Sequence, residues 1–134
     1  MSGVVIDTSV AVAWGFPDET SSTATRAIRA LAEGDGLVPP IFEYEIASAL
    51  LAAARRGRLS EAQARESLRD IAMLPLQTSH EGQSADLLVE AAHRHELSVY
   101  DVAYLILAQE HGAALASEDR RLRAAAERAG VPLL

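Results

Sequence analysis

Short apolar runs alternate along this chain with longer stretches that carry apolar residues on one helical face. The run at residues 3–6 is rich in β-branched residues and too short for a buried helix, so it predicts an interior parallel strand. Capping residues, glycines and prolines mark where the longer stretches begin and end. The expected strands cover residues 3–6, 37–38, 74–77, 113–116 and 131–134, and the expected helices cover residues 8–14, 19–33, 39–56, 60–73, 78–95, 100–111 and 120–129.

Two pairs of residues have the spacing of a capping box, in which a hydroxyl residue is followed three positions later by Glu or Gln. These pairs are Ser60 with Gln63 and Thr78 with Glu81, and each predicts the start of a helix. Strands that alternate with amphipathic helices are typical of an α/β fold. We therefore expect a three-layer sandwich around a central, mostly parallel sheet, with residues 1–134 forming a single domain.

Four acidic residues lie at the margins of apolar segments. Asp7 and Asp119 each follow a predicted strand, Asp101 lies in the first turn of an apolar helix, and Glu45 lies one turn into another helix. Ligands of parallel sheets bind beyond the carboxyl ends of the strands, so Asp7 and Asp119 should face the same edge. Four carboxylates without Cys or a histidine pair suit a hard cation such as Mg²⁺ or Mn²⁺, which also binds phosphate oxygens.

Each acid also has a simpler interpretation. Asp119 can cap the last helix, and Asp101 can interact favourably with the dipole of its own helix. Asp7 can belong to a capped turn, and Glu45 can extend into solvent or pair with Arg56. Each interpretation is reasonable alone, but four acids at one edge of the sheet together favour a functional site.

Composition narrows the possible chemistry. The 134 residues include no Cys and carry a formal net charge of −7. All twelve basic residues are Arg, because the sequence contains no Lys, and this excludes a Walker-A lysine, a Schiff-base lysine and a lysine-dependent phospho-receiver. The net charge argues against nucleic-acid binding over the whole surface but not against a local site. With no leader-like segment and no apolar run of about 20 residues, we expect a soluble, cytoplasmic protein without membrane contact.

Four segments together resemble the successive signatures of PIN-domain ribonucleases, and among them the VapC-like toxins of bacterial toxin–antitoxin pairs. These segments are Val4-Val5-Ile6-Asp7-Thr8-Ser9-Val10, Glu45-Ile46-Ala47-Ser48-Ala49-Leu50, Tyr100-Asp101-Val102-Ala103-Tyr104-Leu105 and Ser117-Glu118-Asp119-Arg120-Arg121-Leu122. No single motif is specific, but the ordered set is, and the resemblance covers the chain from Met1 to Leu134.

The resemblance implies a PIN-like fold and roles for particular residues. The metal-binding, catalytic acids would be Asp7, Glu45, Asp101 and Asp119, and the supporting hydroxyl residues would be Thr8, Ser9, Ser48 and Ser117. Many relatives have Asn at the position of Ser48; because a hydroxyl can still hydrogen-bond, we expect this difference to tune activity rather than abolish it. The implied activity is a Mg²⁺- or Mn²⁺-dependent endoribonuclease that hydrolyses an RNA phosphodiester with activated water. The implied partners are RNA, a cognate antitoxin and a second copy of the chain in a homodimer.

Without Lys, phosphate contacts must come from Arg side chains and backbone N–H groups. Arg120 and Arg123 follow Asp119 on one predicted helix and lie on the same face, so they are candidate RNA contacts. The alternative is a solvated helix face paired with Glu127 or Asp119.

Two rival functions use similar features. A Mg²⁺-dependent phosphatase of the haloacid-dehalogenase type needs a second Asp two positions after the nucleophile, but Ser9 occupies that position, and the required Lys is absent. A non-catalytic interaction module could keep the fold and bind only a protein partner. Metal titration with a short RNA distinguishes these functions from a nuclease.

Overall fold

The computed structural model describes residues 3–16 and 21–134. Its strands are β1 (Val4–Ile6), β2 (Gly36–Val38), β3 (Leu76–Thr78) and β4 (Ala114–Ala116). Its helices are α1 (Thr8–Ala13), α2 (Ser22–Glu33), α3 (Phe42–Arg55), α4 (Glu61–Ala72), α5 (Ala85–His95), α6 (Val99–His111) and α7 (Arg120–Arg128).

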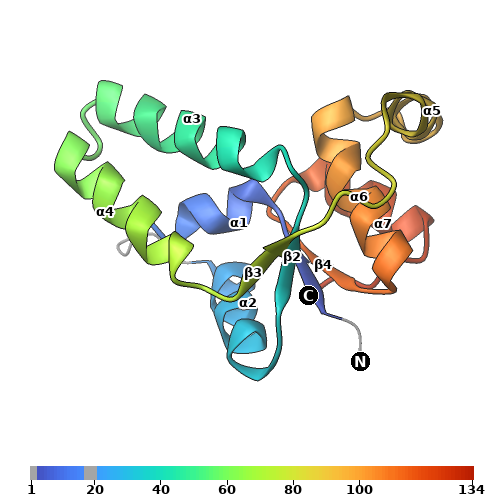
Figure 1. Ribbon diagram of the computed structural model, residues 1–134, viewed down its shortest axis with the longest axis horizontal. Coiled ribbons are helices and arrows are strands. Elements are labelled where there is room, and N and C mark those ends of the chain that lie inside the picture. Colours follow the sequence, from blue (N-terminus) through green and yellow to red (C-terminus); the bar gives the residue numbers. More distant parts are fainter. Residues whose placement is uncertain (1–2, 17–20) are drawn as a thin grey trace.

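The four strands form a parallel sheet in the order β3-β2-β1-β4. Strand β1 therefore lies inside the sheet, and all three of its residues are buried, as expected for a β-branched run covered on both faces. Helices α1 to α4 lie on one side of the sheet and helices α5 to α7 on the other, which makes three layers (Figure 1). The predicted α/β sandwich with a mostly parallel sheet is confirmed.

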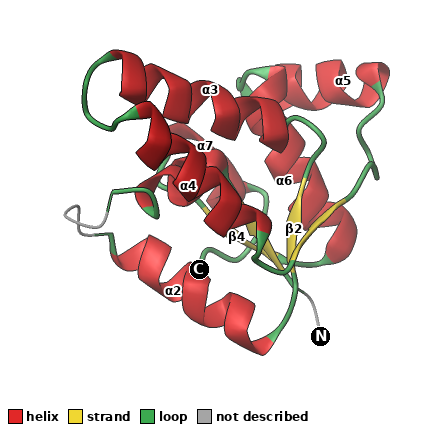
Figure 2. Cartoon of the chain, turned by 60° about the vertical axis from the view of Figure 1, so that its left-hand side comes forward, coloured by secondary structure: helices red, strands yellow, loops and turns green. Residues whose placement is uncertain are grey.

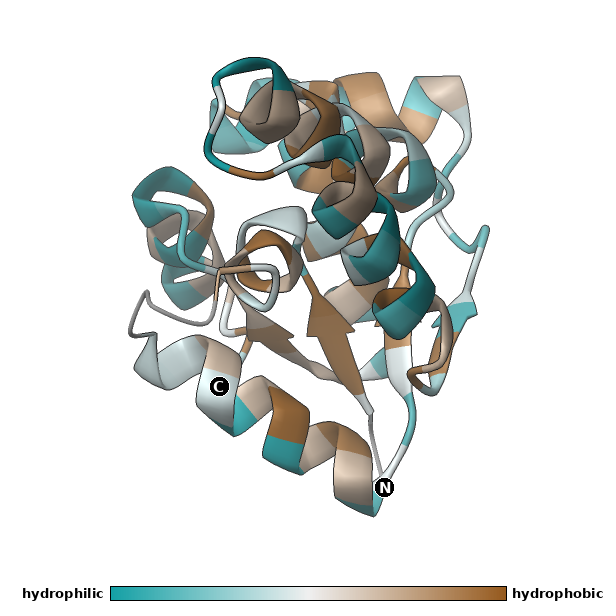
Figure 3. Ribbon diagram, turned by 90° about the vertical axis from the view of Figure 1, so that its left-hand side faces the viewer, coloured by the Kyte–Doolittle hydropathy of each residue, from teal (hydrophilic) through white to brown (hydrophobic). Residues whose placement is uncertain are grey.

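Helix α6 contributes the most continuous part of the core. Its residues 102–108 are all buried, and it contacts β1, β2 and β4. A helix that is apolar on every face must be covered on every face, and α5 and α7 pack against its remaining sides. Figure 2 shows α6 behind the sheet and between its neighbouring helices. Hydrophobic residues concentrate on the central strands, whereas hydrophilic residues lie on the outer helices and loops (Figure 3).

Most predicted elements are present, with ends that differ by a few residues. The Ser60–Gln63 capping box is confirmed: Ser60 Oγ accepts from Gln63 N at 3.0 Å, and Gln63 Oε1 accepts from Ser60 N at 2.9 Å. The start predicted at residue 19 lies outside the described residues. The helix there begins at Ser22, with the Ser21 side chain accepting from Ala24 N.

Two predictions about element ends were wrong. The helix predicted from Thr78 begins only at Ala85, where the Ser84 side chain caps it. The intervening loop instead packs against α6, and Gly82 in this loop has a φ of 70° and lies where a Cβ would overlap Ile106. The last strand, predicted over 131–134, is reduced to one parallel bridge between Leu115 and Leu133.

Candidate active site at the carboxyl edge of the sheet

Asp7 is the centre of the candidate site. It follows β1 directly and is 6% exposed. Its Oδ2 accepts hydrogen bonds from Ser9 Oγ at 2.7 Å and from Ser117 Oγ at 2.8 Å. Burial raises the pKa of Asp7, the nearby charges of Asp101 and Glu45 raise it further, and the two serine hydroxyls oppose the increase. Asp7 is therefore a buried carboxylate that is held in place by two hydroxyls and forms no ion pair within the described residues.

Ser117 connects the first acid to the last. Its side chain is fully buried, and its Oγ accepts from Asp119 N at 3.0 Å while donating to Asp7. Asp119 is the N-cap of α7, and its Oδ1 accepts from Leu122 N at 2.9 Å. The helix-cap interpretation of Asp119 is thus correct for one carboxylate oxygen, while Oδ2 is not part of the cap.

Glu45 reaches the site from α3 and is held by two hydroxyls. Its Oε1 accepts from Tyr104 Oη at 2.6 Å and from Thr8 Oγ1 at 3.0 Å, and these two hydroxyls are 2.7 Å apart. Tyr104 is fully buried, and burial together with the hydrogen bond to Glu45 raises its pKa. Among the described residues, Glu45 forms no ion pair with Arg56. A hydrogen-bonded triad therefore fixes one of its carboxylate oxygens.

Asp101 lies in the first turn of α6, whose N-cap Ser98 accepts from the Asp101 backbone N at 3.0 Å. Burial is the main cause that raises the pKa of Asp101; the charge of Asp119 adds to it, and the Ser98 hydrogen bond and the charge of Arg121 oppose it. The positive charge that acts on this carboxylate therefore comes from α7, although the two side chains form no ion pair among the described residues. Sequence reasoning missed both Arg121 and Tyr104, because their partners belong to other elements.

The structure thus places all four predicted acids in one electrostatic group. Asp7 is influenced by Glu45 and Asp101, and Asp101 by Asp119. In the part of the chain that the structure describes, however, no three acidic or histidine side chains converge closely enough to form a ready-made metal centre. The donor set of hard oxygens around a buried carboxylate suits Mg²⁺ or Mn²⁺ chemically, and their mutual repulsion is what a cation would relieve.

The supporting residues divide into two groups. Thr8, Ser9 and Ser117 all hydrogen-bond to the acids, and Ser9 Oγ also accepts from Glu118 N at 2.9 Å. Ser48 is exposed, and its hydroxyl forms no hydrogen bond within residues 3–16 and 21–134. The structure brings three of the four predicted hydroxyls into contact with an acid and leaves Ser48 outside these contacts.

The two predicted RNA-contact arginines have different surroundings. Arg120 is exposed at the start of α7. Arg123 is half-buried, and its Nη1 donates to the Ser117 carbonyl at 2.9 Å, which ties α7 to the end of β4. Arg123 therefore has a structural contact of its own, and the role of both residues in RNA binding stays a prediction.

Comparison with known proteins agrees with this geometry. The family model described as "PIN domain" matches residues 4–128. The chain is 34% identical over 122 residues to Ribonuclease VapC3 of Pyrobaculum aerophilum, a match that covers 89% of this chain and 91% of that protein. The crystal structure of PAE2754 from Pyrobaculum aerophilum superposes with a TM-score of 0.72 at 22% identity, covering 92% of this chain and 84% of that one. No helix in the described part of the chain combines the length and hydrophobicity needed to cross a membrane.

Proposed function

Since this chain belongs to the PIN-domain family, we propose that it is a metal-dependent endoribonuclease that acts as the toxin of a toxin–antitoxin pair. The observation that carries the proposal is the buried Asp7 carboxylate, on which the charges of Glu45 and Asp101 act, while the charge of Asp119 acts in turn on Asp101. Burying a carboxylate near other acids destabilises the folded protein, and such an arrangement is typical of a site where a cation binds. The identity to a protein named as a ribonuclease supports the choice of substrate.

The residues that would hold the ion are Asp7, Glu45, Asp101 and Asp119. When bound, Mg²⁺ or Mn²⁺ supplies charge neutralisation for the phosphate oxygens and activates a water molecule for attack. The chain's own contribution is to position the ligands. The Ser9 hydroxyl fixes the position of Asp7. Because water would be the nucleophile, no side chain of the protein has to act as one.

The remaining hydroxyls orient the outer acids. Tyr104 and Thr8 both direct hydrogen bonds to one oxygen of Glu45, which leaves the other oxygen of that carboxylate for a ligand. With no Lys in the sequence, arginines are the permanently charged side chains available to bind RNA phosphates beside the metal site. Arg120 and Arg123 are candidates for this contact, and Arg121 is a third, because its charge acts on Asp101.

The proposed partners are RNA, an antitoxin and a second copy of the chain. A basic antitoxin segment would be attracted to the acidic edge, since the net charge of the chain is −7. Helix α5 is a candidate for the homodimer contact, because it contains no buried residue and carries two exposed apolar side chains, Leu87 at 45% and Val89 at 62%.

The test is RNA cleavage by the purified full chain in the presence of Mg²⁺ or Mn²⁺. We expect Asp7→Asn and Asp101→Asn each to lower the cleavage rate by at least about 100-fold, because each removes an anionic ligand with little change in volume. Asp70→Asn on α4 is the matched control and should cleave like the wild type. Isothermal titration should show weaker Mg²⁺ binding in the first two variants only.

Three results would contradict the proposal. Cleavage that continues in EDTA would remove the metal from the mechanism. RNA binding without cleavage at any divalent metal would support the non-catalytic interaction module. Hydrolysis of a phosphomonoester without cleavage of RNA would support a phosphatase.

A further inference from the structure

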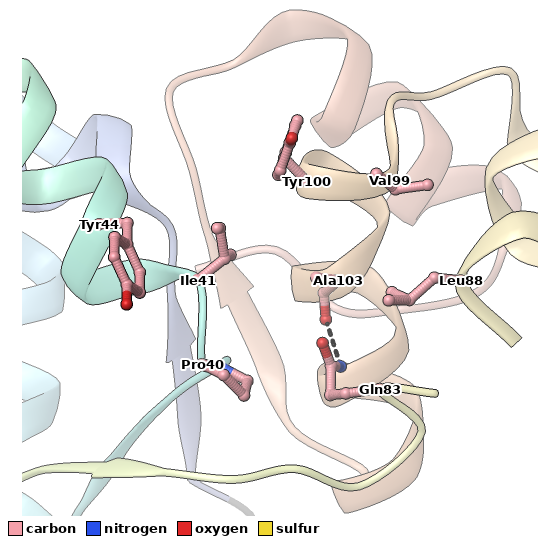
Figure 4. Close-up of a pocket in the computed structure, with 8 residues that line it drawn as sticks. All are labelled: Pro40, Ile41, Tyr44, Gln83, Leu88, Val99, Tyr100 and Ala103. Carbon is pink, nitrogen blue, oxygen red and sulfur yellow. Dashed lines mark hydrogen bonds between the residues drawn. The ribbon is translucent and has the colours of Figure 1, made fainter. Parts of the chain in front are cut away.

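A mostly apolar cavity of about 270 Å³ lies beside the acids, where the first turns of α3 and α6 meet the loop before α5. Ile41 and Tyr44 line it from the α3 side, Tyr100 from α6, and Gln83 and Leu88 from the α5 side (Figure 4). We call it the tyrosine pocket. None of these residues takes part in the contacts that hold the four acids, so the pocket needs its own explanation.

The two tyrosines are unusually exposed for aromatic residues. Tyr44 is 77% and Tyr100 is 55% exposed, whereas the other four aromatic side chains of the chain are buried or half-buried. Aromatic rings with one polar end are suited to binding, because a ligand can cover the ring while the hydroxyl stays in water. A pair of such rings at the mouth of an apolar cavity can accept a flat, partly apolar group.

Gln83 places a fixed hydrogen-bond acceptor in this apolar setting. Its Nε2 donates to the Ala103 carbonyl at 3.1 Å and to the Glu81 carbonyl at 3.3 Å, which uses both amide hydrogens. No group within the described residues donates to its Oε1. Every buried side-chain oxygen in the described residues has a hydrogen-bond partner, so an Oε1 without one must be exposed to solvent. A ligand that enters the tyrosine pocket therefore meets an acceptor and no donor from this side chain.

The helix faces that line the tyrosine pocket lead towards the acidic edge. Ile41 and Glu45 are four residues apart at the start of α3, and Tyr100 and Tyr104 are four apart on α6, so each pair shares a helix face. The hydrogen bond of 2.6 Å between Tyr104 and Glu45 joins the two helices at this point. A chain molecule that crosses the acids can therefore reach the tyrosine pocket with its next unit.

We propose that the tyrosine pocket binds one unstacked nucleobase of the RNA, next to the phosphodiester that is cleaved. The inference rests on the proposed function and adds a base preference to it. Stacking on Tyr44 or Tyr100 supplies most of the affinity and accepts any base. Gln83 favours adenine, cytosine or guanine, whose amino groups can donate to its Oε1. Uracil is disfavoured, because its only donor on the Watson–Crick edge, N3–H, lies between two carbonyl oxygens that repel the Gln83 Oε1 acceptor.

RNA explains this surface better than a second copy of the chain does. An apolar protein side chain would fill the cavity without using the Gln83 acceptor, whereas the Gln83 amide is held by two backbone carbonyls with its oxygen left for a donor such as an amino group. The exposed Leu87 and Val89 of α5 are not part of the pocket lining. A protein occupant is nevertheless an outcome that the experiment detects.

The experiment measures binding of short RNAs to the full chain carrying Asp101→Asn, which prevents cleavage. An abasic site is introduced at each position of the RNA in turn. We expect one abasic position to weaken binding about tenfold or more. In the added variant Tyr44→Ala plus Tyr100→Ala, intact RNA should bind about tenfold more weakly, and this abasic position should have no further effect. Tyr44→Phe plus Tyr100→Phe should bind like the parent, as should the control Met73→Ala, which removes an 85% exposed apolar side chain elsewhere.

Gln83→Leu tests the acceptor separately. With RNAs that differ only at the sensitive position, the parent should prefer cytosine over uracil severalfold, and Gln83→Leu should lose that preference while retaining sensitivity to the abasic site. A merely structural role for Gln83 would weaken binding to both bases equally, and that result would overturn its assignment as the acceptor.

Two further results would overturn the tyrosine pocket as a base site. One is RNA binding that is unchanged in the Tyr→Ala variant. The other is a change of oligomeric state in that variant by light scattering, which would make the pocket an interface between copies of the chain. Cleavage by the wild type is measured separately. Loss of the proposed nuclease activity with base selection intact would refute the proposed function alone, and cleavage without base selection would refute this inference alone.

Discussion

The hydroxyl of Tyr104 offers a direct test of how the site is held together. Tyr104 is fully buried on α6, and its Oη contacts Glu45 Oε1 at 2.6 Å and Thr8 Oγ1 at 2.7 Å. Tyr104→Phe removes one oxygen and keeps the ring, so the core packing stays filled. The substitution therefore isolates the hydrogen bonds that link α1, α3 and α6.

The expected loss can be estimated from the structure. A hydrogen bond to a charged group contributes roughly 1.5–3 kcal/mol to stability. Glu45 is half-buried and keeps its bond from Thr8, so the lower end, about 1.5 kcal/mol, applies. With an unfolding entropy of about 2.1 cal/mol/K per residue over 134 residues, this loss corresponds to a decrease in Tm of about 5 °C.

The assay is a double-mutant cycle of Tyr104→Phe with Glu45→Ala, in which urea denaturation in EDTA gives the free energy of unfolding of each protein. If the hydrogen bond contributes as the distance indicates, the two changes should couple by about 1 kcal/mol or more. Leu51→Ala, which shortens an exposed side chain elsewhere on α3, is the control and should show no coupling with Tyr104→Phe. Additive losses, with coupling below about 0.3 kcal/mol, would refute the triad as a stabilising contact.

Two further predictions concern charge. Burial raises the pKa of Asp7 in the folded state above its value in the unfolded chain. Protonated Asp7 therefore favours the folded state at low pH, and this stabilisation is lost as the pH rises from the unfolded-state pKa through the folded-state pKa. In EDTA, Asp7→Asn should therefore match or exceed the wild-type unfolding free energy at pH 7, by roughly 1 kcal/mol or less. The difference should shrink as the pH falls toward 4. A clearly lower Tm of the variant at pH 7 would mean that the carboxylate is structural. For RNA binding in the Asp101→Asn background across a salt series, Arg121→Gln should lower affinity and flatten the slope by about one unit if it contacts phosphate. The double change Arg120→Ala plus Arg123→Ala tests the other two arginines, and an unchanged slope in either protein would assign those residues to another role.

Local sequence signals determined most of the secondary structure. The β-branched run of β1 and the apolar helix α6 require burial whatever surrounds them, and the Ser60–Gln63 box closes within its own helix. The order of strands and helices then left few arrangements other than a parallel sheet covered on both faces. Because Asp7 and Asp119 each follow a strand, the order of residues was by itself sufficient to assign both acids to one edge of that sheet.

Tertiary structure decided the features that depend on contacts between distant segments. Thr78 and Glu81 have capping-box spacing, yet the loop after β3 packs against α6, and the helix begins seven residues later at Ala85. The same holds within the site. Nothing local to Tyr104 shows that its hydroxyl meets a carboxylate 59 residues earlier in the chain, and nothing local to Arg121 shows that its charge acts on α6. A short-range pattern specifies which face of an element is buried, because burial is favourable against any apolar neighbour. A hydrogen bond instead requires one particular atom at one distance, so its partner is set only when the helices pack.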